Sequence, residues 1–210
     1  MTKEGKSPVP PLPPTSQTLG HLLLHELYGA PQYHNQESYL DLIQQGADIH
    51  MIDTHGNTAL LLAAFQGVPQ VIKALVDAGS NVNHTNMHGR PPLSFAVAWN
   101  DEVSTQYLLD HGANPNIQDE HGTTPLMLAA MEAHHINIVH LLLRKGADIK
   151  LKDQNGMTAL DHAIDRNNSA TAHVLEAEDR RRTTIAFTTA AKKGTPKARK
   201  IVRPRRPGTF

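Results

Sequence analysis

One short pattern recurs four times at a nearly constant interval, and this repetition constrains the fold more than any other feature. In each copy a glycine precedes a leucine by four residues, as in Asp53-Thr-His-Gly56-Asn-Thr-Ala-Leu60. The glycines are Gly56, Gly89, Gly122 and Gly156, so the intervals are 33, 33 and 34 residues. A fixed period of this length predicts a solenoid, in which each unit packs against its neighbours.

A second set of glycines keeps the same interval. Gly46, Gly79, Gly112 and Gly146 are each followed by a small residue and then by Asp or Asn, again 33, 33 and 34 residues apart. Such a glycine is typical of the residue just after a helix, where the backbone turns left-handed. The extra residue of the last interval falls within 131–138, which we expect to be a turn between two helices.

Between these landmarks each unit is predicted to form two short helices. The first is rich in alanine, as in 58–66, and the second carries apolar residues at helical spacing, as in Val71, Leu75 and Val76. Only 4% of the residues are aromatic while 39% are hydrophobic, which favours helices packed through Leu and Ala over a large β-sandwich. The sequence therefore predicts an all-α fold.

Two stretches of the third unit resemble the ankyrin repeat family. Thr124-Pro125-Leu126 is similar to the start of that family's first helix, and Leu142-Leu143-Arg-Lys-Gly146-Ala147-Asp148 to the end of its second. The resemblance covers about residues 35–178 and implies an ankyrin-repeat solenoid, with helix-turn-helix units joined by hairpin-like turns.

The chain departs from the family pattern at the start of each first helix. A histidine usual there is replaced in every unit, and Pro91 stands where threonine is usual, so the inter-helix hydrogen bonds of those side chains are in question. The replacing residues are Leu61, Ser94, Met127 and Asp161.

We expect three segments: a disordered Pro-rich segment at 1–17, a repeat domain at 18–178 and a basic disordered tail at 179–210. The ends of the repeat domain are irregular or polar, as the end units of a solenoid must be. Within it we place a degenerate cap at 18–52 (with helices at 18–28 and 39–45), repeats at 53–85, 86–118 and 119–152, and a capping repeat at 153–178.

The resemblance implies a non-enzymatic module that binds a partner protein through its concave groove. Partners in this family contact the turn tips and the exposed ends of the first helices. At those ends, Phe65, Trp99 and Met131 could form one apolar stripe, and exposed Trp is enriched in binding hot spots; the alternative is that they pack as ordinary core. The other partner-binding candidates are His55, Asn57, Gln66, Met87, His88, Arg90, Glu120, His121, Glu132, Gln154, Asn155, Asp165 and Arg166.

Three of the tips place a histidine directly before the glycine. His55, His88 and His121 are equivalent, with Asn155 in the fourth tip. A column of imidazoles would make binding sensitive to pH, because His titrates near pH 6.5. The simpler interpretation, which we favour, is a polar turn residue that recurs through repeat duplication.

We predict no metal, cofactor or catalytic site. The chain has no cysteine, and the His groups at 21 and 25, 84 and 88, and 134, 135 and 140 lack a convincing further ligand. No phosphate loop or nucleophile elbow is present. Asp161, His162 and Asp165 lie close together on the last predicted helix, but an acid beside a histidine is a common arrangement.

The charge of the chain is divided between its two parts. Residues 179–210 hold eleven Lys and Arg against Asp179 alone, which leaves nine bases and 19 acids in the remaining residues. Such a tail binds polyanions, so the alternative function is a nuclear-targeted or nucleic-acid-associated factor; an anionic membrane surface, a solubilising role or contact with the acidic body are further interpretations. The basic residues are Arg180, Arg181, Arg182, Lys192, Lys193, Lys197, Arg199, Lys200, Arg203, Arg205 and Arg206.

The remaining expectations concern location and assembly. The chain has no cysteine, no apolar leader and no long apolar run, so we expect a cytoplasmic or nuclear monomer without a membrane span. A bacterial effector, secreted without a conventional signal peptide, is a third alternative because bacteria use this family in that way. The stretch at 10–13 resembles a WW-domain ligand.

Overall fold

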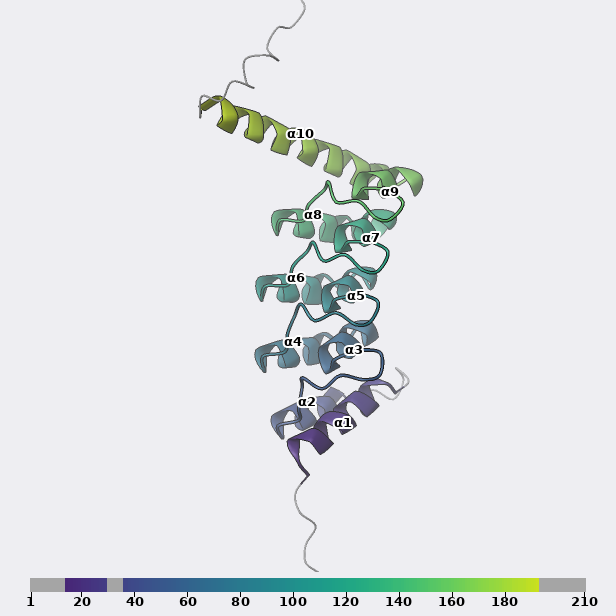
Figure 1. Ribbon diagram of the computed structural model, residues 1–210, viewed down its shortest axis with the longest axis vertical. Helices are drawn as coiled ribbons and strands as arrows, with labels where there is room; N and C mark the ends of the chain where they lie inside the picture. Colours follow the sequence, from purple (N-terminus) through teal and green to yellow (C-terminus); the bar gives the residue numbers. More distant parts are fainter. Residues whose placement is uncertain (1–13, 30–35, 193–210) are drawn as a thin grey trace, which may run out of the picture.

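The computed structural model describes residues 14–29 and 36–192, and these form a stack of helix pairs (Figure 1). The inner helices α3, α5, α7 and α9 form one layer, and the outer helices α4, α6 and α8 form the second. The described residues contain no strand beyond one isolated bridge, between Ile52 and Thr58. The all-α solenoid is thus confirmed. The elements are α1 (Ser16–Leu27), α2 (Gln36–Gln44), α3 (Ala59–Gln66), α4 (Pro69–Asp77), α5 (Pro92–Ala98), α6 (Glu102–Asp110), α7 (Pro125–Met131), the 3-10 turn η2 (Ala133–His135), α8 (Ile136–Arg144), α9 (Ala159–Asp165) and α10 (Ser169–Lys192).

Most inner helices begin at a threonine that caps them. The Thr58, Thr124 and Thr158 hydroxyls each accept a hydrogen bond from the backbone N–H three residues later, at 3.2–3.3 Å. These bonds satisfy donors that the first helical turn would otherwise leave unpaired. Helix α5 is preceded instead by Pro91, which provides no such bond.

The residues that replace the family's histidine act locally or in the core. Leu61 and Met127 are almost fully buried, and Ser94 is buried as well. In α9 the Asp161 carboxylate accepts a hydrogen bond from the Thr158 N–H at 2.8 Å, which completes a capping box. Leu61 and Met127 therefore pack as apolar core, and Asp161 caps its own helix.

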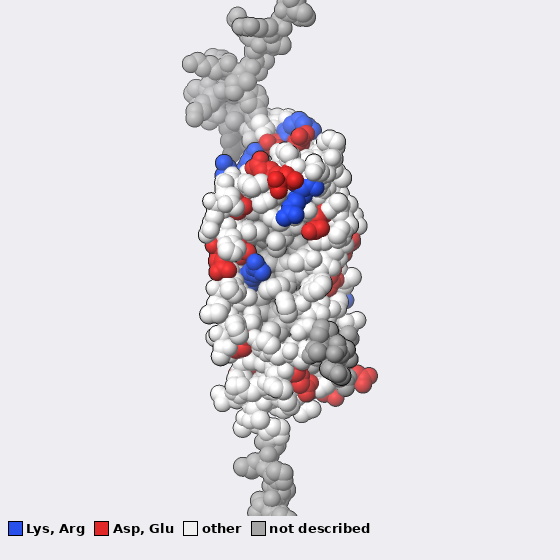
Figure 2. All heavy atoms as spheres, turned by 90° about the vertical axis from the view of Figure 1, so that its right-hand side faces the viewer, with Lys and Arg blue, Asp and Glu red and all other residues white. Residues whose placement is uncertain are grey.

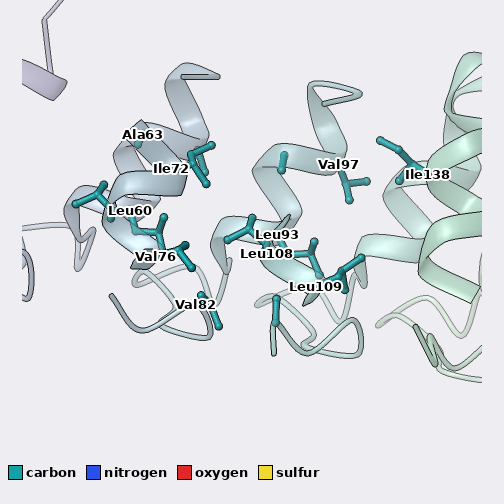
Figure 3. Packing of buried hydrophobic residues seen from close by; sticks show 14 of the residues in the cluster. Leu60, Ala63, Ile72, Val76, Val82, Leu93, Val97, Leu108, Leu109 and Ile138 are labelled. Carbon is teal, nitrogen blue, oxygen red and sulfur yellow. The ribbon is translucent and has the colours of Figure 1, made fainter. Parts of the chain in front are cut away.

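Equivalent leucines and alanines of successive units form one continuous core (Figure 3). Leu60, Leu93 and Leu126 occupy the same position in α3, α5 and α7 and are fully buried. The alanines three residues later in these helices are also buried, and their small side chains let neighbouring helices approach closely. Each unit can bury this face only against the next, which explains the strict period.

The turns follow the two sets of glycines. Gly46, Gly79, Gly112 and Gly146 have φ between 85° and 94°, in the left-handed region, directly after an outer helix. The extra residue of the third unit lies in the short turn η2 between α7 and α8, as expected. The insertion therefore leaves both helices of that pair intact.

Helix α10 corrects the expected C-terminal boundary. We placed the end of the last repeat at 178 and a disordered tail from 179, whereas α10 continues to Lys192. The Glu178 carboxylate pairs with Arg181 and Arg182 at 2.6 Å, one turn along the same helix. Arg182 also donates a hydrogen bond to the Ala147 carbonyl at 3.0 Å, which fixes α10 to the preceding unit.

The N-terminal cap also differs in its bounds. Helix α1 begins at Ser16 rather than 18, and the Thr15 hydroxyl accepts a hydrogen bond from the Thr18 N–H at 3.2 Å. Helix α2 begins at Gln36 rather than 39. Most of the Pro-rich segment, including 10–13, and the basic residues from Lys193 onward lie outside the described residues.

No helix in the described part of the chain has the length and apolar character needed to cross a lipid bilayer.

Candidate functional site

The tips of successive units are joined edge to edge by backbone hydrogen bonds. The Met87 N–H donates to the His55 carbonyl at 3.0 Å, and the Glu120 N–H donates to the His88 carbonyl at 2.9 Å. The Gln154 N–H donates to the His121 carbonyl in the same way, at 2.9 Å. The glycine-marked turns are therefore aligned along one edge of the stack, as the repeat pattern requires.

One polar side chain holds each tip in shape. Asp53, Asn86, Asp119 and Asp153 each accept two backbone hydrogen bonds through Oδ1, from the residues two and four positions later. Burial alone would raise the pKa of the Asp53 carboxyl, but the hydrogen bonds from the Tyr28 hydroxyl and from Asn57 outweigh it and lower that pKa. The tips are thus preorganised surfaces.

The three tip histidines lie on this edge but have different partners. The His88 Nδ1 is 2.7 Å from the Glu120 carboxylate, and the His121 Nε2 is 3.8 Å from the same oxygen. The His55 Nδ1 instead lies 3.4 Å from the Tyr28 hydroxyl. The three histidines therefore occupy equivalent positions without equivalent contacts, and pH-sensitive binding stays a prediction.

A hollow of about 390 Å³ lies between the first two tips and the inner helices α3 and α5. It unites six of the candidate residues and four that sequence reasoning missed. From the candidates it takes His55, Asn57, Phe65, Gln66, His88 and Arg90; the additional lining residues are Tyr28, Leu62, Asn86 and Phe95. We refer to it below as the tip hollow.

The apolar wall of the tip hollow consists of packed aromatic side chains. The Phe65 and Phe95 rings meet edge to face, with their centroids 5.6 Å apart. At the N-terminal end, the Tyr28 hydroxyl donates a hydrogen bond to the Asp53 carboxylate. The Gln66 side chain donates to the Leu27 carbonyl at 3.0 Å, so α1 is fixed against the first unit and closes that end.

No acidic side chain of the described residues lines the tip hollow. Its basic lining residues are His55, His88 and Arg90. On the face of the molecule that carries the inner helices, Lys, Arg, Asp and Glu gather toward the C-terminal end, while the N-terminal half shows mostly uncharged residues (Figure 2). The N-terminal half of this face is thus its least charged part.

A family model for ankyrin repeats in three copies matches residues 27–119 and 105–185. The chain belongs to the ankyrin-repeat family. No curated protein matches it. Ankyrin repeats are in general protein-protein interaction modules and typically non-enzymatic, so this chain is expected to have protein partners.

Trp99 of the second ankyrin unit lies against the first. Its indole N–H donates a hydrogen bond to the Phe65 carbonyl at 2.7 Å, while 61% of the residue remains exposed. It lines a second hollow of about 310 Å³, which shares Gln66 with the tip hollow. Phe65 and Trp99 therefore form part of one surface, whereas Met131 is half-buried and lines neither hollow.

The other partner-binding candidates lie apart from the tip hollow. Met87 is exposed on the second tip, beside His88. Those of the C-terminal units are exposed either at the tips or after the inner helices, and none lines the tip hollow. The tip residues are Glu120, His121, Gln154 and Asn155, and the residues at the helix ends are Glu132, Asp165 and Arg166.

The outer face has a larger hollow, of about 630 Å³, between α6 and α8. Its lining mixes both charges, and its acids already have partners: Asp110 pairs with Lys145 at 2.5 Å and Glu102 accepts from Asn137 at 2.7 Å. We prefer the smaller tip hollow as the candidate site because it combines an aromatic wall with a few exposed polar groups, among them the Arg90 guanidinium.

The histidines and acids of the ankyrin stack act structurally where they meet. The His162 Nε2 lies 2.8 Å from the Asp153 carboxylate, and both side chains are buried between the fourth tip and α9. No three His, Asp or Glu side chains of the described residues converge as a metal site. His135 is buried in η2, and burial lowers its pKa below the ordinary range.

The first basic cluster is integrated into the fold. Arg180 lies 3.5 Å from Glu176, and Arg181 and Arg182 pair with Glu178. The hydrogen bond from Arg181 is the largest cause that lowers the pKa of Glu178. Burial offsets it in part, the hydrogen bond from Arg182 adds to it, and the resulting pKa is about 2. Helix α10 includes Lys192 as its last residue. The cluster at 180–182 therefore stabilises α10 on the stack and is not part of a disordered tail.

Proposed function

We propose that this ankyrin-repeat chain binds a partner protein through its tips and inner helices, with the tip hollow as the central contact. The observation that carries the proposal is a preformed hollow lined by α1 and by the first two complete units, with an aromatic wall. Preformed hollows with an apolar wall and a few polar groups are the usual form of a recognition site. Exposed Trp99 beside it supplies the residue type most enriched among hot spots.

Photocrosslinking from two matched positions tests this proposal. Met87 on the second tip is 63% exposed and Val103 on outer helix α6 is 56% exposed, so the two differ in location more than in accessibility. We expect a photoreactive residue at position 87 to crosslink a discrete partner in lysate, and one at position 103 to yield much less of it. Equal crosslinking from both positions, or stronger crosslinking from 103, would contradict a groove-centred site.

Substitutions at Trp99 measure its contribution to binding. Trp99→Ala should weaken capture of the crosslinked partner by about 2 kcal/mol or more, as for a hot spot. Because the indole also bonds to the Phe65 carbonyl, Trp99→Phe and the unfolding midpoint of each variant serve as controls. Unchanged affinity in Trp99→Ala would exclude Trp99 from the interface.

The alternative function, polyanion binding or nuclear targeting by the basic tail, is tested by truncation. Of the eleven bases in 179–210, the cluster at 180–182 already pairs within α10, which weakens this alternative. Deletion should therefore remove 193–210 and retain α10. If partner capture or nuclear accumulation of a fluorescent fusion is lost with this deletion while the groove variants are silent, the tail is the functional element.

A further inference from the structure

We infer that the tip hollow selects a peptide segment in which a large apolar side chain lies next to a carboxylate. This inference rests on the proposed function, because it specifies what the same surface would recognise. It follows from three features: the size of the hollow, the chemistry of its wall and the state of its rim charges.

The size and the wall favour one apolar anchor. A volume of about 390 Å³ is near the lower end for ligand sites, which span about 300–1,000 Å³. The hollow therefore holds one or two side chains and not a broad folded surface. Its wall is made by the Phe65 and Phe95 rings together with Leu62, so the side chain that it favours is large and apolar.

The carboxylates near the rim of the tip hollow already have partners within the protein. The Asp53 carboxylate accepts hydrogen bonds from the Tyr28 hydroxyl and from the Asn57 side chain, the latter at 2.8 Å. The Glu120 carboxylate lies 2.7 Å from the His88 Nδ1. These carboxylates point to groups of the protein and do not line the hollow.

The Arg90 guanidinium, by contrast, retains free donors. Its single bond runs from Nε to the Asp119 carboxylate at 3.4 Å, and its terminal nitrogens have no partner among residues 14–29 and 36–192. The Arg90 side chain is 44% exposed, so a ligand can reach these nitrogens. A guanidinium fork with free ends suits the bidentate binding of a carboxylate.

The C-terminal units are less suited to a peptide that carries a carboxylate. Glu132, Asp161 and Asp165 are exposed on or after α7 and α9, with Arg166 as the exposed base beside them, so acids outnumber bases where the inner helices end and disfavour an acidic segment. The two ends of the surface thus differ: the N-terminal units present Arg90 at the tip hollow, whereas charged residues of both signs gather toward the C-terminal end in Figure 2. Charge complementarity places the carboxylate of the partner at the N-terminal units.

Selection from a displayed random-peptide library on the full chain tests the inference. We expect the enriched peptides to share an acidic residue within two positions of Phe, Trp, Leu or Met. Arg90→Glu should weaken these peptides at least about tenfold, since a hydrogen bond to a charged group contributes about 1.5–3 kcal/mol. Arg144→Glu is the matched control, because Arg144 is an exposed arginine on the outer helix α8.

A charge exchange provides the sharper result. Replacing the acidic residue of a selected peptide by Lys should abolish binding to the native chain and restore at least part of it to Arg90→Glu, which isolates the pair. Three results would each overturn the inference: the enriched peptides lack acidic residues, their binding does not change in Arg90→Glu, or the native chain enriches no more peptides than Phe65→Ala does. Peptides without acidic residues that still compete with crosslinking from position 87 would refute the preference for a carboxylate and leave the proposed function intact. Peptides that bind without competing would refute the proposed function, because they would bind outside the groove.

Discussion

Replacing Gly122 by alanine should destabilise the stack more than the same change at Gly112. Both glycines have positive φ, 77° and 87°, so alanine pays a backbone cost of about 1–2 kcal/mol at either position. A Cβ at Gly112 meets nothing within 4 Å. At Gly122 it would lie 3.0 Å from the Asp153 Cα and 3.1 Å from the Gln154 nitrogen, both atoms of the next tip.

That contact sets the size of the difference. Backbone atoms cannot rotate away as a side chain can, so the fourth tip must shift and strain its hydrogen bond to the His121 carbonyl, now 2.9 Å. Loss of this bond costs about 0.5–1.5 kcal/mol. We therefore expect a loss of about 1–2 kcal/mol for Gly112→Ala and of about 1.5–3.5 kcal/mol for Gly122→Ala.

Urea unfolding, followed by helical circular dichroism, measures both variants against the native chain. The comparison should use midpoints at equal slope, because repeat proteins can lose cooperativity. A second transition in Gly122→Ala alone would also agree with a weakened joint between the third and fourth units. Equal losses for the two variants would refute the argument that the tips are held in direct contact.

Three further substitutions test the C-terminal units. Asn168→Ala should cost about 2–4 kcal/mol in urea unfolding, because its buried amide donates to the Ala130 and Glu132 carbonyls at 3.1 Å, and a near-neutral result would contradict this role. Burial lowers the pKa of His135, so its contribution to the free energy of unfolding is complete above about pH 6.5 and declines as pH falls below that value. His135→Gln should therefore reduce the change of the urea midpoint between pH 7.5 and 5.5. A pH dependence of the midpoint that the substitution leaves unchanged would argue against this role. The pKa of Glu178 is about 2, so its contribution is present above about pH 4.5 and is lost as pH falls toward 2; Glu178→Gln should remove this decline from melting curves at pH 5 to 2.5, and a persisting decline would assign it to another carboxyl.

The sequence was sufficient to predict the stack because local signals and burial agree. The two glycine series mark backbone positions that few other residues tolerate, and the alanines of the first helices mark close packing. Both signals lie within a single unit, so they can be recognised without knowing how distant segments meet. The insertion at η2 was predictable for the same reason.

Helix α10 was mispredicted because its stabilising contacts are less visible in the sequence. Residues 183–192 include several threonines, which are weak helix formers, and show no apolar period. The pairs from Glu178 to Arg181 and Arg182 at helical spacing were a readable signal. The bond from Arg182 to the Ala147 carbonyl crosses 35 residues and has no sequence signal.

The candidate site was only partly predictable. Six lining residues follow from positions that the repeat makes equivalent, whereas Tyr28 comes from the irregular cap, where no equivalent position exists. Phe95 replaces the Leu62 of the preceding unit, and its position within the helix favoured a core residue. The free donors of Arg90 depend on where Asp119 lies in the next unit, which only the structure provides.

The location of the tip hollow determines which units a bound ligand would stabilise. Helices of the stack pack within their own unit and against the adjoining unit, and the described residues that line the hollow come from the end of α1, from α3 and α5 and from the first two tips. A bound peptide would therefore slow amide hydrogen exchange in α3 and α5 while leaving exchange in α9 and α10 almost unchanged. Ligand binding would then stabilise the N-terminal units of this solenoid against local unfolding without stabilising the C-terminal units.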